Sequence, residues 1–341
     1  MRKNFNEKIS VYPILLLVLS LLANCKSKDN LLVEAPWIGF NDYRDSKIEC
    51  SQFIAHIDTL MLCADSVYVS QIQDFCVDDS CIYVLDKAKS IYLFHSSNGR
   101  LLKKVQLVGR GRSEYLNPQA IEVLDGIVYV LDMDGRCVLK YDMELNFLDR
   151  IKIAFAPLDF MKVDGGFLFY NLTPSERLKR IVHTDEQGSV LNSFLTDQQE
   201  TDLLLTDKVF CRNGRNGYYI SEPVSDVLHE WKDNRISELF RFDLGKEDDR
   251  KISKTSELIT KEGVNILYSL VSSDYVVTLF LANGFLFTNL YRMADETSLT
   301  GLADTHLPYP FFPKKISGNT LFGLYEQRDH HNLMMVSYHL L

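Results

Sequence analysis

The string Ile82-Tyr-Val-Leu-Asp86 recurs almost unchanged as Val128-Tyr-Val-Leu-Asp132, 46 residues further along the chain. Each copy is preceded by a short apolar stretch and a turn. Each is followed by a polar turn, an alternating stretch, a second turn and a fourth apolar stretch, at residues 102–107 and 148–153. Four short strands joined by tight turns, with no helix between them, predict an antiparallel meander.

Weaker copies of the same strand continue to the end of the chain. The six equivalent strands are centred near residues 84, 130, 169, 219, 278 and 323. Their spacing averages about 48 residues, close to the 40–50 residues of a propeller blade. The sequence therefore predicts an all-β, six-bladed β-propeller with four-stranded antiparallel blades. Two stacked β-sandwiches are the alternative, but they would not require near-equal repeats.

The two ends of the repeat region predict how the ring closes. Residues 334–341 form a third strand of the last blade, with no chain left to supply a fourth. Residues 56–62 read as a strand without a blade of its own. If this N-terminal strand completes the last blade, the ring is closed and no sheet edge stays open.

A resemblance to a known family rests on the first two blades. The strings Ile82–Asp86, Ile91–Phe94, Asn98-Gly99 and Gly109–Tyr115 resemble the six-bladed β-propeller lipoproteins of the NHL-repeat type. These proteins are common in Gram-negative envelopes. Their loop usually reads Gly-x-Gly-Pro-Gly-Glu-Tyr, and here Arg112 and Ser113 stand in place of the Pro and of the Gly that follows it.

The N-terminus is typical of an export signal. Basic residues precede an apolar run of about thirteen residues, which is too short for a permanent membrane span. The run ends in Leu22-Ala23-Asn24-Cys25, which resembles the lipobox of bacterial lipoproteins, where the cysteine is acylated. An ordinary cleaved signal is the alternative. We expect residues 1–24 to be a signal peptide, 25–45 a lipid-anchored tether and 46–341 the propeller.

Composition and charge exclude several classes of protein. The chain has 341 residues, of which 46% are hydrophobic, so it can bury a core and is not disordered. Its formal charge of −9 argues against a nucleic-acid partner. The expected location is the cell envelope, at the outer membrane, because Lys26 follows the anchor cysteine and no acidic residue stands beside it.

The cysteines permit disulfides without requiring them. Lipidation of Cys25 would leave six cysteines, an even number in an exported protein. Cys76 and Cys81 flank a predicted four-residue hairpin loop, which would place them directly opposite each other. A bridge between them is one interpretation, and free cysteines in strands are the favoured one.

Candidate binding residues come from loops that a propeller gathers on one face. Arg110 and Arg112 have the geometry to grip a carboxylate or phosphate, whereas Glu114 and Tyr115 would equally hold their loop on the next blade. Mixed donors and acceptors suit a glycan, a peptide or a partner loop, but the same charges would also serve only to solvate the loops. The candidate ligand-binding residues are Arg110, Arg112, Glu114, Tyr115, Gln119, Asp132, Asp134 and Arg136.

Signals of catalysis or metal binding are weak. Asp132-Met-Asp134-Gly135 opens like a calcium loop but lacks a Glu at the twelfth position. His330-His331 falls on a predicted turn between strands, where neighbours point apart. Gln71, Gln119 and Asp159 are candidate axial ligands but match no known metal triad. No hydrolase motif is present, and we expect no cofactor.

The sequence thus predicts a lipid-anchored binding or scaffold protein that recognises a glycan, a peptide or an envelope protein. The alternative is a metal-dependent propeller hydrolase or lyase of the lactonase kind. We favour the binding protein, because no catalytic constellation is evident.

Overall fold

The repeated string forms strands that are buried on both faces. β5 (Cys81–Asp86) and β9 (Ile127–Asp132) each carry five consecutive buried residues. Neighbouring sheets cover both faces of such a strand, so it reads as a continuous apolar run rather than an alternating one. All six predicted second strands are present, the other four being β13 (Gly166–Asn171), β17 (Gly217–Ser221), β21 (Tyr275–Ala282) and β25 (Thr320–Glu326).

The computed structural model describes a defined part of the chain. The described residues are 35–40, 43–44, 46–64, 67–195, 208–214, 217–223, 225–244, 264–327 and 332–341. The expected signal peptide, Cys25 and the pair His330-His331 lie outside them. Pro36–Leu341 form one compact unit, to which all the described strands belong. No helix formed by the described residues is long and apolar enough to span a membrane.

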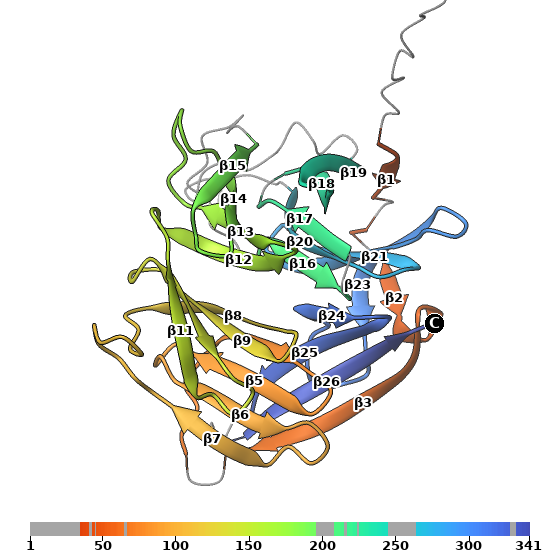
Figure 1. The fold of residues 1–341 in the computed structure, drawn as a ribbon. Coiled ribbons are helices and arrows are strands. Elements are labelled where there is room, and N and C mark those ends of the chain that lie inside the picture. Colours follow the sequence, from red (N-terminus) through yellow and green to blue (C-terminus); the bar gives the residue numbers. More distant parts are fainter. Residues whose placement is uncertain are drawn as a thin grey trace, which may run out of the picture. The chain divides into compact units, whose positions relative to one another are not determined.

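Six antiparallel sheets form the blades of a propeller, as predicted (Figure 1). Blade 1 consists of β4 (Ile72–Val77), β5, β6 (Ile91–His95) and β7 (Leu101–Val105). Blade 2 consists of β8 (Pro118–Leu124), β9, β10 (Cys137–Tyr141) and β11 (Phe147–Lys152). Blade 3 consists of β12 (Pro157–Val163), β13, β14 (Ile181–Asp185) and β15 (Val190–Phe194).

The second half of the ring repeats this plan with additions from the N-terminal segment. Blade 4 consists of β16 (Phe210–Asn213), β17, β18 (Val227–Lys232) and β19 (Arg235–Asp243). Blade 5 consists of β20 (Val264–Val271), β21, β22 (Phe285–Arg292) and β23 (Thr297–Asp304). Blade 6 consists of β24 (Lys315–Ser317), β25, β26 (Asn332–Leu340) and β3 (Ile54–Cys63).

Blade 6 closes the ring with strands from the two ends of the described chain. β3 pairs antiparallel with β26, with Leu62 opposite Leu333 and Ile57 opposite Tyr338 (Figure 1). The predicted closing strand is therefore confirmed. β3 thus supplies the fourth strand of the last blade and covers the edge of β26.

Two short strands precede the closing strand and were not predicted. β1 (Trp37–Gly39) pairs parallel with β19, and β2 (Lys47–Glu49) pairs parallel with β23. Each adds a fifth strand to the outer edge of a blade. Residues 37–39 belong to the segment that was predicted to be a tether, yet the side chain of Ile38 is fully buried.

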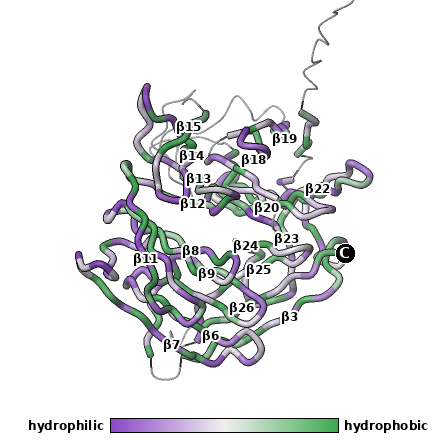
Figure 2. The backbone as a smooth tube through the Cα atoms, in the orientation of Figure 1, coloured by the Kyte–Doolittle hydropathy of each residue, from purple (hydrophilic) through white to green (hydrophobic). Residues whose placement is uncertain are grey.

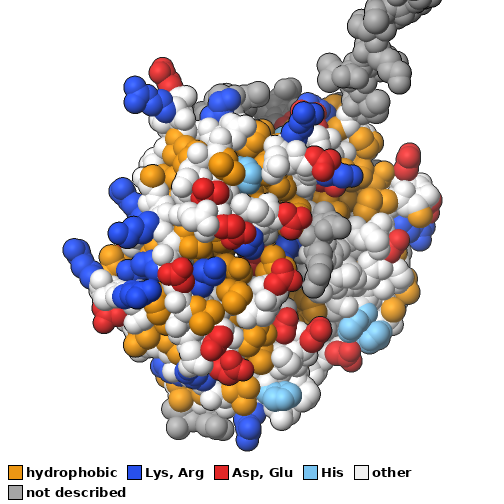
Figure 3. All heavy atoms as spheres, viewed as in Figure 1, with side chains coloured by type: hydrophobic (Ala, Val, Ile, Leu, Met, Phe, Trp, Pro, Cys, Tyr) orange, Lys and Arg blue, Asp and Glu red, His pale blue; other side chains and the backbone are white. Residues whose placement is uncertain are grey.

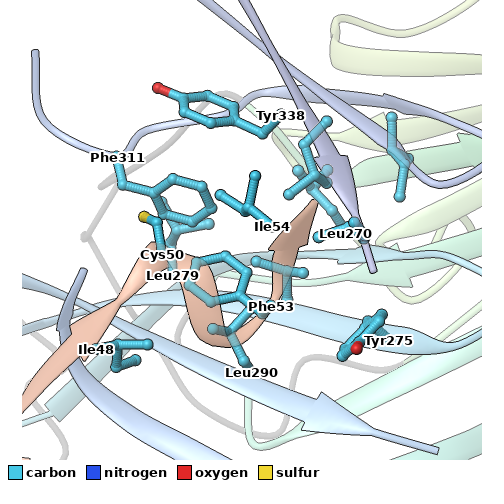
Figure 4. Packing of buried hydrophobic residues seen from close by; sticks show 14 of the residues in the cluster. Ile48, Cys50, Phe53, Ile54, Leu270, Tyr275, Leu279, Leu290, Phe311 and Tyr338 are labelled. Atoms are coloured by element: carbon cyan, nitrogen blue, oxygen red, sulfur yellow. The ribbon is translucent and has the colours of Figure 1, made fainter. Parts of the chain in front are cut away.

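The core lies between the faces of neighbouring blades. Figure 2 shows hydrophobic residues running along the strands, with hydrophilic residues frequent in the loops. A short 3-10 helix, Cys50–Gln52, leads into the closing strand and places Phe53 in the core. The rings of Phe53 and Phe311 lie edge to face, with their centroids 5.6 Å apart, and the ring of Phe311 lies 5.0 Å from that of Tyr338 (Figure 4). The segment before β3 is thus packed against blades 5 and 6.

The cysteines of the described residues are all free thiols, in agreement with the favoured interpretation. They are Cys50, Cys63, Cys76, Cys81, Cys137 and Cys211. The expectation that Cys76 lies directly opposite Cys81 was wrong. Val77 pairs with Ile82 and the N–H of Asp78 donates to the carbonyl of Cys81, so the loop is shortened to two residues, 79–80, and Cys76 stands opposite Tyr83.

Candidate functional site

The innermost strands of the blades enclose a pocket around their common axis. We call it the axial pocket, and its empty space is about 660 Å³ including its open mouth. β4 contacts β8, β8 contacts β12, and β16 contacts both β12 and β24, so strands far apart in sequence share one lining. Its charged lining residues are Asp74, Glu122, Asp159, Lys208, Arg212, Lys314 and Lys315.

Two carboxylates and two ammonium groups meet in this pocket as the axial cluster. Nζ of Lys208 lies 3.9 Å from Oδ2 of Asp74 and 3.8 Å from Oδ1 of Asp159. Nζ of Lys315 lies 3.0 Å from Oδ1 of Asp74. Lys208 precedes the first strand of blade 4, while Asp74 belongs to blade 1, opposite it in a ring of six. The ion pair between Lys208 and Asp74 therefore crosses the axis.

Backbone groups of neighbouring blades also bind these carboxylates. Asp74 accepts a hydrogen bond of 3.0 Å from the N–H of Ile121 in blade 2. Asp159 accepts bonds of 2.8 and 3.1 Å from the N–H groups of Val209 and Phe210 at the start of blade 4. Buried carboxylates are stable only when such donors or charges compensate the loss of water. The axial cluster thus also ties the inner strands together.

The same surroundings shift the pKa values of the two carboxyl groups in opposite directions. Burial raises the pKa of Asp159, and the attraction of Lys208 together with the backbone hydrogen bonds does not cancel this effect. Burial acts on Asp74 too, but the attraction of Lys208 and Lys315 outweighs it and holds the pKa of Asp74 below its usual range. The pKa of Lys315 is lowered by burial, against the attraction of Asp74. Asp74 is therefore the more strongly ionised carboxyl group of the two.

A second layer of charge lies further along the strands. Nε of Arg212 on β16 lies 2.8 Å from Oε1 of Glu122 on β8, although blade 3 stands between these two blades. The guanidinium also donates to the carbonyl of Val123, and Glu122 accepts a bond of 2.7 Å from the N–H of Lys162. Arg212 therefore links the inner strands of blades 2 and 4.

A bulge at the same position of several blades aims side chains at the pocket. The pairing of the first two strands shifts register near the start of β4, β8, β12 and β20. Such bulges bend a strand and redirect its side chains. The residue after the bulge is Asp74, Ala120, Asp159 or Tyr268, according to the blade. Blades 1 and 3 thus place a carboxylate at one equivalent position.

Three of the sequence-predicted residues have buried or loop-bound side chains. The carboxylate of Asp132 accepts hydrogen bonds from the N–H groups of Leu116 (2.9 Å) and Asn117 (2.8 Å) in the connection that enters its blade. The hydroxyl of Tyr115 is buried and donates to the carbonyl of Lys89 (2.8 Å). Glu114 accepts from the N–H of Gly111, three residues earlier in the same loop. These contacts organise the loops of the face.

The remaining predicted residues lie at the surface or beside the pocket. Arg110, Arg112, Asp134 and Arg136 are exposed, and Gln119 is half-buried at the bulge of β8. Figure 3 shows acidic and basic side chains interspersed on the face that it draws. Of the candidate axial ligands, Asp159 lines the axial pocket and Gln71 is exposed. A role of these residues in ligand binding stays a prediction.

Most residues of the axial pocket were not predicted from the sequence. Among them are Asp74, Glu122, Lys208, Arg212 and Lys315. An alignment of the blades on the Tyr-Val-Leu-Asp string would have shown that Asp74 and Asp159 occupy one position, each opposite the residue before the last of the second strand. No comparable signal marks the lysines, because Lys208 lies just before the four-residue strand β16 and Lys315 begins the three-residue strand β24.

The fold and the axial pocket define the protein as a six-bladed β-propeller with a charged pocket on its axis. Residues 40–337 match a domain of unknown function, DUF4934, and the chain belongs to this family. No curated protein matches the chain.

Two solved structures are similar over almost their whole length. A protein from Bacteroides fragilis described as exported has a TM-score of 0.68 at 14% identity, covering 89% of this chain and 99% of its own. A member of the DUF4221 family from Bacteroides vulgatus has a TM-score of 0.55 at 10% identity, covering 85% and 98%. At these identities the likeness shows the fold alone.

Proposed function

We propose that this protein is a lipid-anchored binding module of the cell envelope whose axial pocket recognises a carboxylate-bearing glycan or peptide. The observation that carries the proposal is the charge of the pocket. Its lining has four basic residues against three acidic ones, a formal charge of +1, in a chain whose formal charge is −9. A local excess of positive charge attracts and orients an anionic group.

Lys314 is the residue that we expect to meet the ligand first. Its side chain is half-buried in the pocket lining, and its Nζ lies 5.6 Å from the centre of the Phe312 ring. Lys208 and Lys315 are engaged with Asp74, so they would set the field of the pocket rather than move to a ligand.

Binding to an array of envelope-type glycans tests this site. We expect the full chain to bind sugars that carry a carboxylate and not their neutral, reduced counterparts. Lys314→Gln should weaken that binding about tenfold or more, the usual effect of losing one charge-assisted hydrogen bond. The matched control is Lys104→Gln, whose ammonium also lies over an aromatic ring, 5.2 Å from the centre of Tyr92, on outer strand β7. Equal effects of the two substitutions would contradict the proposal.

Anchoring at Cys25 is the second part of the proposal. It is supported by the Leu22–Cys25 string and by the fold shared with a protein described as exported. Radiolabelled palmitate should enter the wild-type chain but not Cys25→Ala, and membrane fractionation should place the labelled protein in the outer membrane. Labelling that persists in the variant would show that the cysteine is not the anchor.

The pairing of the axial carboxylates favours a binding protein over a metal-dependent hydrolase or lyase. Lysine ammonium groups lie within 4 Å of both Asp74 and Asp159, where a divalent cation would be repelled. Metal analysis of the purified chain and of Asp159→Asn separates the two functions. A divalent ion that the wild type retains and Asp159→Asn loses would favour the enzyme.

A further inference from the structure

Blade 6 carries two imidazoles and a carboxylate at the seam of the ring, where β3 pairs with β26. His56 and Asp58 belong to β3, His339 belongs to β26, and His56 stands directly opposite His339. Since alternate residues of a strand share a face, all three side chains lie on one face of the sheet. Their ligand atoms all lie within 4.8 Å of one another.

Both imidazoles already lie close to the carboxylate. Nε2 of His339 and Nε2 of His56 lie 3.0 and 3.6 Å from Oδ2 of Asp58. The two imidazole rings are stacked, with centroids 3.9 Å apart and 10° between their planes. Two imidazoles and a carboxylate are ligands that Zn²⁺ and related divalent ions take, and water completes such a site where it is exposed.

A third strand holds one of the imidazoles in the orientation that a metal requires. Thr320 on β25 stands directly opposite His339, and its hydroxyl lies 3.0 Å from Nδ1. If Nδ1–H donates to that hydroxyl, Nε2 keeps its lone pair for an ion. Metal-binding histidines are commonly fixed in this way by an acceptor at the other ring nitrogen.

The position of the cluster explains why its side chains are accessible. Leu60 and Leu62 of β3 and Met335 of β26 share its face and pack against blade 1. The cluster lies further along the same strands, where the side chains of His56 and Asp58 are 60% and 68% exposed. An ion from solution can therefore reach it without opening the core.

We propose that His56, Asp58 and His339 bind one divalent transition-metal ion, with Zn²⁺ the best match, and that the ion fastens the closing strand to the C-terminal strand. The ligands come from opposite ends of the described chain, so the site exists only when the ring is closed. An ion that binds only the closed form stabilises it by mass action.

Zinc titration of the chelator-treated full chain tests the site. We expect the wild type to bind one equivalent more than the double variant His56→Ala/His339→Ala, and to melt at a higher temperature when zinc is present. Thr320→Val should weaken binding about tenfold, the usual effect of losing a partner of a metal-bound histidine. The matched control is His95→Ala in blade 1, whose Nδ1 contacts the hydroxyl of Ser97, and it should leave affinity and stoichiometry unchanged.

Two outcomes would overturn the proposal. One is an equal zinc stoichiometry and an equal zinc-dependent melting shift in the wild type and the double variant. Only the shift of each protein with and without zinc is compared, so that a weaker seam in the variant does not count as lost binding. The other is a thiolate-to-metal band in the Co²⁺-substituted wild type, which would assign the ion to a cysteine site instead.

Discussion

At the scale of single residues, Asp74 and Asp159 show how position decides the state of a side chain. The two are equivalent in blades 1 and 3, yet the pKa of one is lowered and that of the other is raised. Asp74 has two ammonium groups within 4 Å, whereas Asp159 has one. The number of cations decides whether burial or attraction dominates.

This difference predicts how stability depends on pH. The pKa of Asp74 in the folded chain lies below its usual value of 3.8, so Asp74 contributes stability above that pH and loses it as the pH falls through the folded value. Asp159 has a raised pKa, so its ionised form subtracts stability at neutral pH. At pH 7, Asp74→Asn should therefore lower the free energy of unfolding by about 3–5 kcal/mol, the usual effect of breaking a buried ion pair.

Asp159→Asn is the matched comparison, and at pH 7 it should lower the free energy of unfolding by less than Asp74→Asn does. Urea unfolding from pH 7 down to about pH 3 measures both variants. The difference in the free energy of unfolding between the wild type and Asp74→Asn should become smaller as the pH falls, because the wild type then loses the same ionised carboxylate. A larger cost for Asp159→Asn at pH 7 would contradict this explanation of the axial cluster.

A site residue could be predicted from the sequence when the same residue recurs in another blade. Asp132 is visible in the sequence because it ends a repeated string, and it repeats because a carboxylate there binds the entry loop of the blade. Asp86 does the same in blade 1, where it accepts a bond of 3.1 Å from the N–H of Ser70. A repeated polar residue therefore points to blade construction. Lys208 and Lys315 occur once each and build the pocket, and their convergence depends on the closed ring.

At the scale of elements, strand length decided what could be predicted. The six second strands have five to eight residues each, enough to show an apolar run, and all were found. β1 and β2 have three residues each, and their parallel partners lie far along the chain. Three residues carry no periodic pattern, so their place at the edges of blades 4 and 5 is set by tertiary contacts alone.

β1 is expected to stabilise blade 4 through one side chain. Ile38 is fully buried and packs with Phe242 and other residues of blades 4 and 5, whereas its neighbour Trp37 is 57% exposed. Ile38→Ala should lower the free energy of unfolding by about 2–5 kcal/mol, and Trp37→Ala by about 0.5 kcal/mol or less. Urea unfolding of the two variants measures this. Equal effects would show that the segment before the closing strand behaves as a tether rather than as part of the blade.

At the scale of the whole molecule, both proposed binding sites depend on the closure of the ring. The axial pocket exists only while opposite blades hold their inner strands within reach, because Lys208 of blade 4 pairs with Asp74 of blade 1. The proposed metal site likewise requires β3 to lie beside β26. Closure by an N-terminal strand could be predicted from the missing fourth strand of the last blade, since each blade of a propeller repeats the same four strands.

An engineered disulfide across the seam tests this closure most directly. Cys63 stands opposite Asn332 at the end of β3, and its N–H donates to the carbonyl of Gly99 rather than to its cross-strand partner. In such a non-hydrogen-bonded pair the two side chains lie close together. Asn332→Cys should therefore form a disulfide with the native Cys63 under mild oxidation, found by peptide mapping, and should raise the melting temperature. Met334→Cys is the matched control, because Met334 stands opposite Met61 and is too far from Cys63 to bridge. A closed ring predicts a cross-link in Asn332→Cys alone; its absence there, or the same cross-link in both variants, would contradict the closure.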